Sequence, residues 1–560
     1  MSQTMPVILH PKKFGSANTP TCFASLIQSF EANGSSAALT FYQGDEYKGL
    51  SYQQLQTSVQ SWCDFLQSKY GLQVGDRVAV CMRNGLDFVP VALAVIAIGA
   101  VLVPFNPESE PDFVDTSLKV SGAILAVLEN DLNSALAERF HLRFRDRCIP
   151  ASVTAPEATS PMALTAHSPQ CPALMLFTSG TTGHPKGVLL SQSALLANAQ
   201  SMIANFGLSG NTQLAIMPLF HAHAFGFGLM TSLLSGSHLV LTRGLSPSLW
   251  ARAINEQSVS FTSLAPPLLQ MLLRMRVKQR DVPSLRAILV SSAPLLRHQA
   301  QVFIERTGIR LIHGWGLSEY TNFATCLRVG AEDEYYQNAL IQTNHFSVGH
   351  ALDGTQIQIR SVDGAVLDEG KEGELWVRGS SMMLGYHNND AATQTAIQNG
   401  WLRTGDLGYW QSSPEGVQHF ISGRIKEIII RGGEKIVPMA VEAMLRRRLP
   451  ELDHMPWAVV GFPHDIYGEE IGLYVQRELA VDSEYLLETL NKLSNDFRPK
   501  VVVVGLHDIP MTHTGKVQRL KLQSYFKPYS MASGSSQLII DSTNSSIEIP
   551  CQSNLLSALS

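Results

Sequence analysis

The alternation of apolar and polar positions predicts a chain of buried strands and helices. Residues 77–105, RVAVCMRNGLDFVPVALAVIAIGAVLVPF, contain a β-branched run, a mostly apolar helical run and a second strand-like run. This order predicts a buried β–α–β unit. The apolar stretch 88–105 could also be a membrane span, but its two prolines and its glycine favour a helix–turn–strand. Similar alternation at 213–245 and 285–325 predicts layered α/β architecture with buried sheets.

The pattern changes twice further along the chain. From residue 355 the segments TQIQIRSVDG and GELWVRG alternate in polarity, which is typical of a smaller β-rich subdomain. Near residue 424, strand-like runs start to mix with helical ones such as MAVEAMLRRRLP and DSEYLLETLNKLSNDF. We therefore expect an α/β N-terminal domain over 1–423, with two layered α/β subdomains plus a small β subdomain, and a small α+β C-terminal domain over 424–526. The Ser- and Asn-rich residues 527–560 are expected to be a flexible tail, whose apolar QLIID has no assigned role.

Composition narrows the class of protein. At 560 residues, 45% of them hydrophobic and 16% charged, the chain is a multidomain globular protein. The net charge of −5 and the lack of a long basic run exclude nucleic acid as the main partner. Seven scattered cysteines without a CxxC pair indicate a reducing compartment, with no disulfide framework and no zinc site. Neither a signal peptide nor a peroxisomal SKL address is evident, so we expect a cytoplasmic protein without a transmembrane segment. Its oligomeric state stays open.

A stretch of small residues beside one lysine, TSGTTGHPKG at 178–187, is the main candidate for binding chemistry. It fits neither the Walker A pattern nor G-x-G-x-x-G. Its glycines can turn backbone N–H groups toward an anion, its hydroxyl groups can donate hydrogen bonds, and its lysine adds positive charge. These residues are Thr178, Ser179, Gly180, Thr181, Thr182, Gly183 and Lys186. From composition alone, a solvated hydroxyl-rich turn fits equally well.

Motifs elsewhere in the chain decide between these interpretations. After TSGTTGHPKG come, in order, MPLFHAHAFG, SSAPL, GWGLSE, GELWVRG, GWLRTGDLG, GRIKEIIIRGGEKIVP and PMTHTGKVQR. This series resembles the adenylate-forming superfamily of acyl- and aryl-CoA synthetases, nonribosomal adenylation domains and beetle luciferases, over roughly residues 20–525. The resemblance implies that ATP activates a carboxylic acid to an acyl-adenylate with release of pyrophosphate. A thiol then takes the acyl group and AMP leaves.

The resemblance also implies residue roles around the triphosphate. Residues 178–186 would hold the β- and γ-phosphates of ATP, and Ser318 would bind the α-phosphate. Glu319 would ligate Mg²⁺, for which a carboxylate is a suitable hard oxygen ligand. Outside the motif, a glutamate at this position would be read as one more surface carboxylate.

Further residues are implied at the nucleoside and in the C-terminal domain. Trp315 would pack on adenine, although an isolated tryptophan is more often a core residue. Asp406 would accept both ribose hydroxyls, assisted by Arg424. Lys426 would be the hinge about which a mobile C-terminal domain rotates, and Lys516 would reach the α-phosphate and the carboxylate. The remaining residues expected around the nucleotide are Ala293, Gly314 and Gly316.

The acid and the thiol are less defined. Amino-acid-activating relatives place an aspartate where this chain has His221, so we expect an aryl or fatty acid without an α-ammonium group. His221 would line or gate the site, beside Phe225. Ser291 and Ser292 replace the glycines of SGGAP and would shorten or polarise the site, which disfavours long-chain acids. A pair of glycines, Gly432 and Gly433, would let a pantetheine arm approach.

CoA is the expected acceptor because the chain carries no fused carrier domain. The alternative is a stand-alone adenylating enzyme that loads phosphopantetheine on a separate carrier protein. A luciferase-like oxidase of the acyl-adenylate and a nucleotide-binding protein without catalysis are further alternatives. The presence of Lys516, Glu319 and Asp406 argues against the last of these. The expected catalytic residues are Lys516, Glu319 and His221.

Overall fold

The computed structural model describes residues 20–152, 164–179, 185–293, 295, 297–342, 347–476, 482–494, 497–512, 516–532 and 535–541. The chain divides into two compact units. Unit 1 consists of Met1–Lys371, Leu375–Thr404 and Trp410–Phe420, and unit 2 of Glu372–Glu374, Gly405–Tyr409 and Ile421–Ser560. The long segment of unit 2 begins close to the boundary that the sequence predicts between residues 423 and 424.

One sheet of unit 1 contains the predicted β–α–β unit. Its central strands β3 and β4 are parallel and joined by the helix α3 (Phe88–Ala97), every residue of which is buried. The apolar stretch 88–105 is therefore a buried helix–turn–strand, as expected. Within the described residues the strand order is β18 (Gly385–Tyr386), β8 (Pro185–Ser191), β7 (Pro172–Ser179), β4 (Val101–Phe105), β3 (Arg77–Cys81), β5 (Leu125–Leu128) and β6 (Cys148–Pro150).

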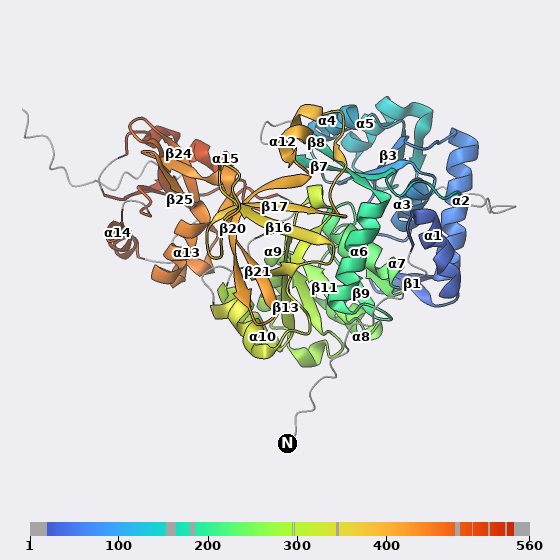
Figure 1. The fold of residues 1–560 in the computed structure, drawn as a ribbon, viewed down its shortest axis with the longest axis horizontal. Coiled ribbons are helices and arrows are strands. Elements are labelled where there is room, and N and C mark those ends of the chain that lie inside the picture. Colours follow the sequence, from blue (N-terminus) through green and yellow to red (C-terminus); the bar gives the residue numbers. More distant parts are fainter. Residues whose placement is uncertain are drawn as a thin grey trace, which may run out of the picture. The chain divides into compact units, whose positions relative to one another are not determined.

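A longer sheet runs through the rest of unit 1. Its strands β9, β11, β12 and β13 are parallel neighbours, so their carboxyl ends lie along one edge of the sheet (Figure 1). In the described part of the chain the order is β16 (Thr355–Arg360), β17 (Gly373–Gly379), β20 (Trp401–Ser413), β21 (Gly416–Arg424), β15 (Ser347–Ala351), β14 (Phe323–Cys326), β13 (Arg310–Gly316), β12 (Ala287–Val290), β11 (Phe261–Leu264), β9 (Thr212–Ala215), β10 (His238–Leu241), β1 (Ala37–Gln43) and β2 (Glu46–Ser51), with β19 (Ile397–Gln398) paired to β20.

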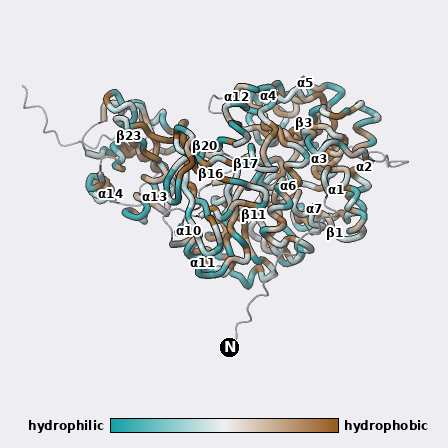
Figure 2. Tube along the Cα trace, in the orientation of Figure 1, coloured by the Kyte–Doolittle hydropathy of each residue, from teal (hydrophilic) through white to brown (hydrophobic). Residues whose placement is uncertain are grey.

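Helices flank these sheets. The described α-helices of unit 1, besides α3, are α1 (Phe23–Gln28), α2 (Tyr52–Tyr70), α4 (Pro111–Ser121), α5 (Ser134–Phe144), α6 (Gln192–Phe206), α7 (Thr231–Leu234), α8 (Pro247–Glu256), α9 (Pro266–Arg274), α10 (Arg297–Thr307), α11 (Asp333–Gln337) and α12 (Asp390–Ala396). Two short helices, η3 (Ala224–Met230) and η5 (Ser318–Tyr320), carry candidate site residues. Hydrophobic segments run through the interior of each unit (Figure 2). Of the helices that the structure describes, none is both long and apolar enough to cross a bilayer.

Local signals fix the helix that follows the lysine-bearing strand. The Ser191 hydroxyl at the end of β8 accepts a hydrogen bond from the backbone N–H of Ala194 and caps α6. Gly207 ends α6 with φ of 63°, a left-handed conformation that suits glycine. Because the cap residue is also the last residue of β8, the start of α6 holds this strand in place.

Unit 2 is a mixed sheet with helices, as the sequence predicts. Its described strands are β23 (Glu434–Ile436), β22 (Ile429–Arg431), β25 (Gly468–Gln476), β26 (Val501–Gly505) and β27 (Gln537–Asp541) in that order, with β24 (Trp457–His464) on β25. Its helices are α13 (Pro438–Arg448), α14 (Ser483–Asn491) and α15 (Arg519–Leu522), with the short helices η7 (Ile425–Glu427), η8 (Pro450–His454) and η9 (Gln523–Tyr529).

The expected tail 527–560 differs from the prediction where the structure describes it. Residues 527–529 finish η9, and the apolar QLIID forms β27, which pairs in parallel with β26 from Val501↔Gln537 to Gly505↔Asp541. Serine and asparagine content suggested an extension, but five residues with an apolar centre are enough for a strand once a partner edge exists. Residues 542–560 lie outside the described part.

Candidate active site

The two ends of the candidate phosphate loop, one of which carries Lys186, lie on a β-hairpin. Strands β7 and β8 are antiparallel, with Thr178 opposite Lys186 and Ser179 opposite Pro185. The strand pair therefore brings the first and last candidate residues of the loop together. The candidates between them, Gly180, Thr181, Thr182 and Gly183, lie outside the described residues.

A tyrosine connects the loop lysine to the candidate metal ligand. The Nζ of Lys186 lies 5.1 Å from the centre of the Tyr386 ring. The Tyr386 hydroxyl donates a hydrogen bond of 3.0 Å to Oε1 of Glu319. Strand β18 pairs with β8 at Tyr386↔Val188, which fixes the tyrosine beside the hairpin. The structure thus brings together Lys186 and Glu319, which are far apart in the sequence.

Tyr386 remains a hydrogen-bond donor under ordinary conditions. Burial, and then the carboxylate of Glu319, raise the pKa of Tyr386 well above its usual range. A protonated hydroxyl can hold one carboxylate oxygen while the other stays available. Tyr386 was not predicted as a site residue, because a lone tyrosine in LGYHN has no pattern of its own.

The chemistry of Glu319 fits Mg²⁺. Mg²⁺ is usually bound by one or two carboxylates, with phosphate oxygens and water completing its shell. Among the described residues, no group of three or more His, Cys, Asp or Glu side chains could hold a metal ion. The single half-buried carboxylate of Glu319 is therefore compatible with a metal that arrives with the nucleotide.

The candidate adenine residues lie at the end of β13. A Cβ on Gly314 would lie 2.9 Å from the Phe323 ring, and a Cβ on Gly316 would lie 1.7 Å from the Asn322 carbonyl oxygen. Glycine is required at both positions because β14 returns immediately beside β13. The largely buried Trp315 stands between them, and the turn that follows carries Ser318 and Glu319 on η5.

The candidate acid-binding residues gather at the carboxyl ends of parallel strands. Ser291, Ser292 and Ala293 follow β12, while His221 lies in the turn after β9 and Phe225 in η3. The carboxyl edge of parallel strands is where ligands bind in open α/β sheets. Phe225 is fully buried, and its backbone N–H donates to the carbonyl oxygen of His221. The structure therefore groups the four residues that the sequence assigns to the acid.

A second histidine in the same turn was missed. His223 is buried, and its Nδ1 lies 3.1 Å from Oγ of Ser292 and 3.2 Å from Oγ of Ser291. Burial, with a further contribution from His221, lowers the pKa of His223 to about 3, so the imidazole is neutral. In FHAHAF the two histidines are equally plausible from the sequence, and only the fold distinguishes them.

In unit 2 the candidate ribose residues form an ion pair. Nε of Arg424 lies 2.9 Å from Oδ1 of Asp406, which is only 4% exposed. The neighbouring backbone is fixed too, because the Gly405 N–H donates to Oε1 of Glu374. The candidate hinge residue Lys426 follows on η7. Asp406 and Arg424, which the resemblance implies at the ribose, therefore lie together as a pair.

The segment that carries Lys516 is anchored within unit 2. The backbone N–H of Lys516 donates to Oγ1 of Thr512, and the Thr512 N–H donates to the Lys516 carbonyl oxygen. A short distance along the chain, the guanidinium of Arg519 bridges Glu427 at 2.8 Å and Glu442 at 2.7 Å. Because Glu427 adjoins Lys426, Arg519 ties the lysine segment to the hinge segment.

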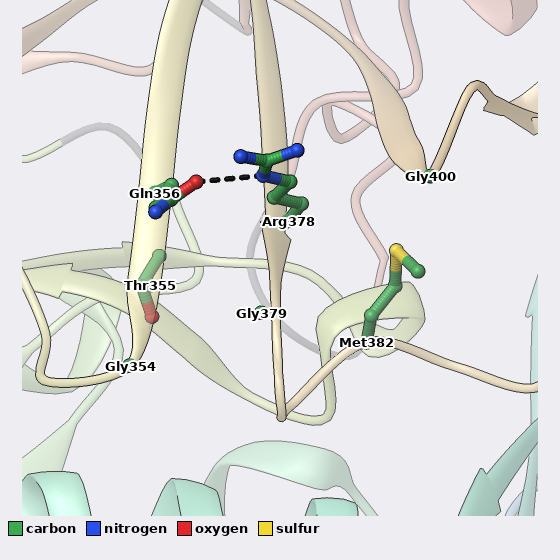
Figure 3. Close-up of a pocket in the computed structure, with 7 residues that line it drawn as sticks. All are labelled: Gly354, Thr355, Gln356, Arg378, Gly379, Met382 and Gly400. Carbon is green, nitrogen blue, oxygen red and sulfur yellow. Dashed lines mark hydrogen bonds between the residues drawn. The ribbon is translucent and has the colours of Figure 1, made fainter.

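A cavity of about 520 Å³ on unit 1 is lined by residues from the start of β16, the end of β17 and two nearby turns. Figure 3 shows the Arg378 guanidinium beside it, donating a 2.6 Å hydrogen bond to Gln356. Its floor adjoins Tyr320, since a Cβ on Gly379 would lie 2.3 Å from that hydroxyl. The sequence assigns no role to these residues. The lining residues are Gly354, Thr355, Gln356, Arg378, Gly379, Met382 and Gly400.

Comparison with known proteins places this site in a family. Residues 28–387 match the family described as AMP-binding enzyme. Sulfoacetate–CoA ligase of Cupriavidus necator is 32% identical over 472 residues, which cover 81% of this chain and 88% of the relative. Oxalate–CoA ligase of Arabidopsis thaliana is 28% identical, over 85% of this chain and 93% of the relative. 2-Succinylbenzoate–CoA ligase of Bacillus cereus is also 28% identical, over 85% and 94%.

The fold is shared with solved structures as well. o-Succinylbenzoate CoA synthetase from Bacillus subtilis, solved with its acyl-adenylate intermediate, superposes with a TM-score of 0.78 at 24% identity, covering 92% of this chain and 99% of that one. The predicted fold class is thereby confirmed. Since the family match spans more than half of its length, the chain belongs to the family of AMP-binding enzymes, as its sequence motifs predict.

Proposed function

We propose that this enzyme uses ATP and Mg²⁺ to activate a carboxylic acid and transfers the acyl group to CoA. A carboxylate oxygen attacks the α-phosphorus of ATP, and the bond to pyrophosphate breaks. The thiol of CoA then attacks the acyl carbon, and AMP leaves. All three relatives named above are CoA ligases, which supports CoA as the acceptor.

The observation that carries this proposal is the arrangement of Lys186, Tyr386 and Glu319. The first step joins two anions, so catalysis depends on positioning and on neutralising charge. Lys186, with Thr178 beside it, neutralises the departing phosphates. Glu319, whose orientation Tyr386 holds, would help to hold Mg²⁺, which would supply further positive charge at the phosphates.

The other residues position the reactants. Ser318 binds the α-phosphate, Trp315 supports the adenine, and Asp406 with Arg424 holds the ribose. Lys516 brings a cation to the carboxylate and the α-phosphate during the first step. A domain rotation about Lys426 then replaces it with the segment of Gly432 and Gly433, past which the pantetheine arm reaches the acyl carbon.

The acid carries no α-ammonium group. His221 stands where an amine-binding carboxylate would be needed, and Phe225 offers an apolar wall. None of the three relatives is named for an amino acid, which supports this restriction. We place the enzyme in the cytoplasm, because its scattered cysteines suit a reducing compartment. Cell fractionation with an antibody tests that location.

The function is tested by measuring pyrophosphate release across a library of carboxylic acids, with and without CoA. The parent should release pyrophosphate only when an acid is present, and CoA should convert the adenylate to thioester and AMP. Lys516→Ala should lose the reaction, whereas Lys521→Ala, an exposed lysine nearby, should keep it. If no acid supports exchange of labelled pyrophosphate into ATP, the proposal is wrong. Acyl transfer only to a phosphopantetheinylated carrier protein would overturn the assignment of CoA.

A further inference from the structure

The cluster of His223, Ser291 and Ser292 contains a hydrogen-bonding atom that has no partner in the fold. Nδ1 of His223 faces the hydroxyl groups of Ser292 and Ser291 at 3.1 and 3.2 Å. The other ring nitrogen, Nε2, is buried and has no hydrogen-bond partner among the residues that the structure describes. Buried polar atoms without a partner are uncommon in folded proteins, and each one calls for an explanation, such as a functional role.

The buried serine determines which nitrogen carries the proton. Ser291 is buried, and within the described part of the chain its hydroxyl faces no acceptor other than Nδ1. If Nδ1 carried the proton, the Ser291 hydroxyl proton would lack an acceptor. With a lone pair on Nδ1, a serine donates to it, and the proton of the neutral ring sits on Nε2. The unused atom is therefore a donor.

Backbone strain at Ser292 supports a functional role for the cluster. Ser292 has φ of 75°, in the left-handed region that disfavours residues with a Cβ. Glycine would adopt this conformation without strain, so the serine hydroxyl is retained at a conformational cost. Strained residues of this kind cluster at ligand sites. Its hydroxyl is one of the two that face Nδ1 of His223.

The cluster adjoins the turn that carries Glu319. The Asn322 side-chain amide donates to the backbone carbonyl oxygen of His223 at 3.5 Å. The Phe323 ring meets the imidazole edge-on, with the ring centres 5.3 Å apart. Asn322 and Phe323 come shortly after η5, so His223 lies near the turn that carries Ser318 and Glu319.

We propose that His223 recognises the tail of the acid, and that the preferred substrate carries an acceptor oxygen there, which takes the Nε2 hydrogen bond. This inference rests on the proposed function, since it concerns the acid-binding part of the same site. The acceptor oxygen can belong to a carbonyl or hydroxyl group or to a second acidic group. A purely hydrocarbon tail leaves the donor buried and unpaired.

The test compares acids in sets of equal chain length: a methyl-ended acid, a keto acid and a dicarboxylic acid. For the parent, kcat/KM for the keto or dicarboxylic form should exceed that of the methyl-ended form by about 10- to 100-fold, the usual penalty for an unpaired buried donor. A preference for the keto acid means that the acceptor is uncharged, and a preference for the dicarboxylic acid means that it is charged. Equal or better use of the methyl-ended acids at every length would overturn the inference.

Variants of the cluster separate recognition from folding. His223→Phe removes the donor and should reduce the preference to about twofold or less, and His223→Gln, which retains a donor, should restore part of it. Ser292→Gly relieves the positive φ, and combined with Ser291→Ala it removes both hydroxyls that face Nδ1, so the double variant should lower the preference. An unchanged preference in both His223→Phe and the double variant would contradict the role of the cluster. If no acid in any set releases pyrophosphate, the proposed function itself fails, which distinguishes the two failures.

Discussion

Replacing Tyr386 by phenylalanine is the sharpest test of how the metal-binding carboxylate is held. The change removes only the hydroxyl that donates to Glu319 at 3.0 Å. It keeps the aromatic ring, over which Lys186 lies at 5.1 Å. The phosphate hairpin and the fold of unit 1 should therefore be unchanged, and the loss is confined to the orientation of one carboxylate.

The expected magnitude follows from that single hydrogen bond. A hydrogen bond to a charged acceptor contributes about 1.5–3 kcal/mol. Loss of a residue that orients a metal-ligating carboxylate usually costs about 10- to 100-fold in metal affinity or activity. The two figures agree, because about 1.4 kcal/mol corresponds to tenfold. We expect the Mg²⁺ concentration for half-maximal activity to rise by about tenfold or more in Tyr386→Phe.

The assay is acid-dependent pyrophosphate release measured over a range of free Mg²⁺. Saturating Mg²⁺ should restore most of the rate of Tyr386→Phe, because the carboxylate itself remains. Tyr485→Phe is the matched control, since that tyrosine is exposed on α14 of unit 2. A Tyr386→Phe enzyme with the Mg²⁺ dependence of the parent would refute the reasoning.

Three further predictions concern other parts of the molecule. Lys516→Ala should slow adenylation by about 10²–10³-fold, about 3–4 kcal/mol, in the same assay, with circular dichroism unchanged; a loss below tenfold would contradict its role. Burial lowers the pKa of both His313 and His419 to about 4, so the unfolded chain takes up protons first as the pH falls. The contribution of the two histidines to the free energy of unfolding is complete above pH of about 6.5 and falls as the pH drops toward about 4. At pH of about 5 the loss is about 2 kcal/mol per histidine. The free energy of unfolding measured with urea should fall with pH over this range, and His419→Gln should reduce the fall. A free energy of unfolding that does not change with pH would contradict this prediction. Gly349→Ala should lower the free energy of unfolding by about 2–4 kcal/mol, because its Cβ would lie 2.1 Å from the backbone carbon of Cys326 at φ of 84°; an unchanged melting temperature would contradict this.

Much of the fold was predictable because its signals are local. The apolar run 88–105 with a glycine at its break predicts α3 and β4, and the strand-like residues around it predict β3. The motifs that hold Lys186 and Glu319 could be found because each is a contiguous string with its own composition. Their spatial proximity could be expected only through the family resemblance, since no local rule pairs residues so far apart.

The residues that were missed depend on long-range contacts. Tyr386 gains its role from the pairing of its strand with β8 and from a carboxylate on the short helix η5. His223 is distinguished from His221 by the serines that follow β12. Strand β27 was missed because its polar surroundings suggested a tail, while its partner edge lies more than thirty residues earlier in the chain. In each case the role depends on a contact with a segment distant in the sequence, which the local sequence does not reveal.

The placement of β27 has a consequence for the integrity of unit 2. Strand β26 contains four consecutive valines, all buried, and β27 satisfies its outer backbone along the whole length from Val501 to Gly505. An enzyme shortened to residue 526 would leave the backbone N–H and C=O groups on this edge of β26 unpaired. Such an edge can pair with a strand of another molecule. Strand β27 thus protects the edge of β26 from self-association, and shortening the chain to residue 526 should make the protein prone to aggregation.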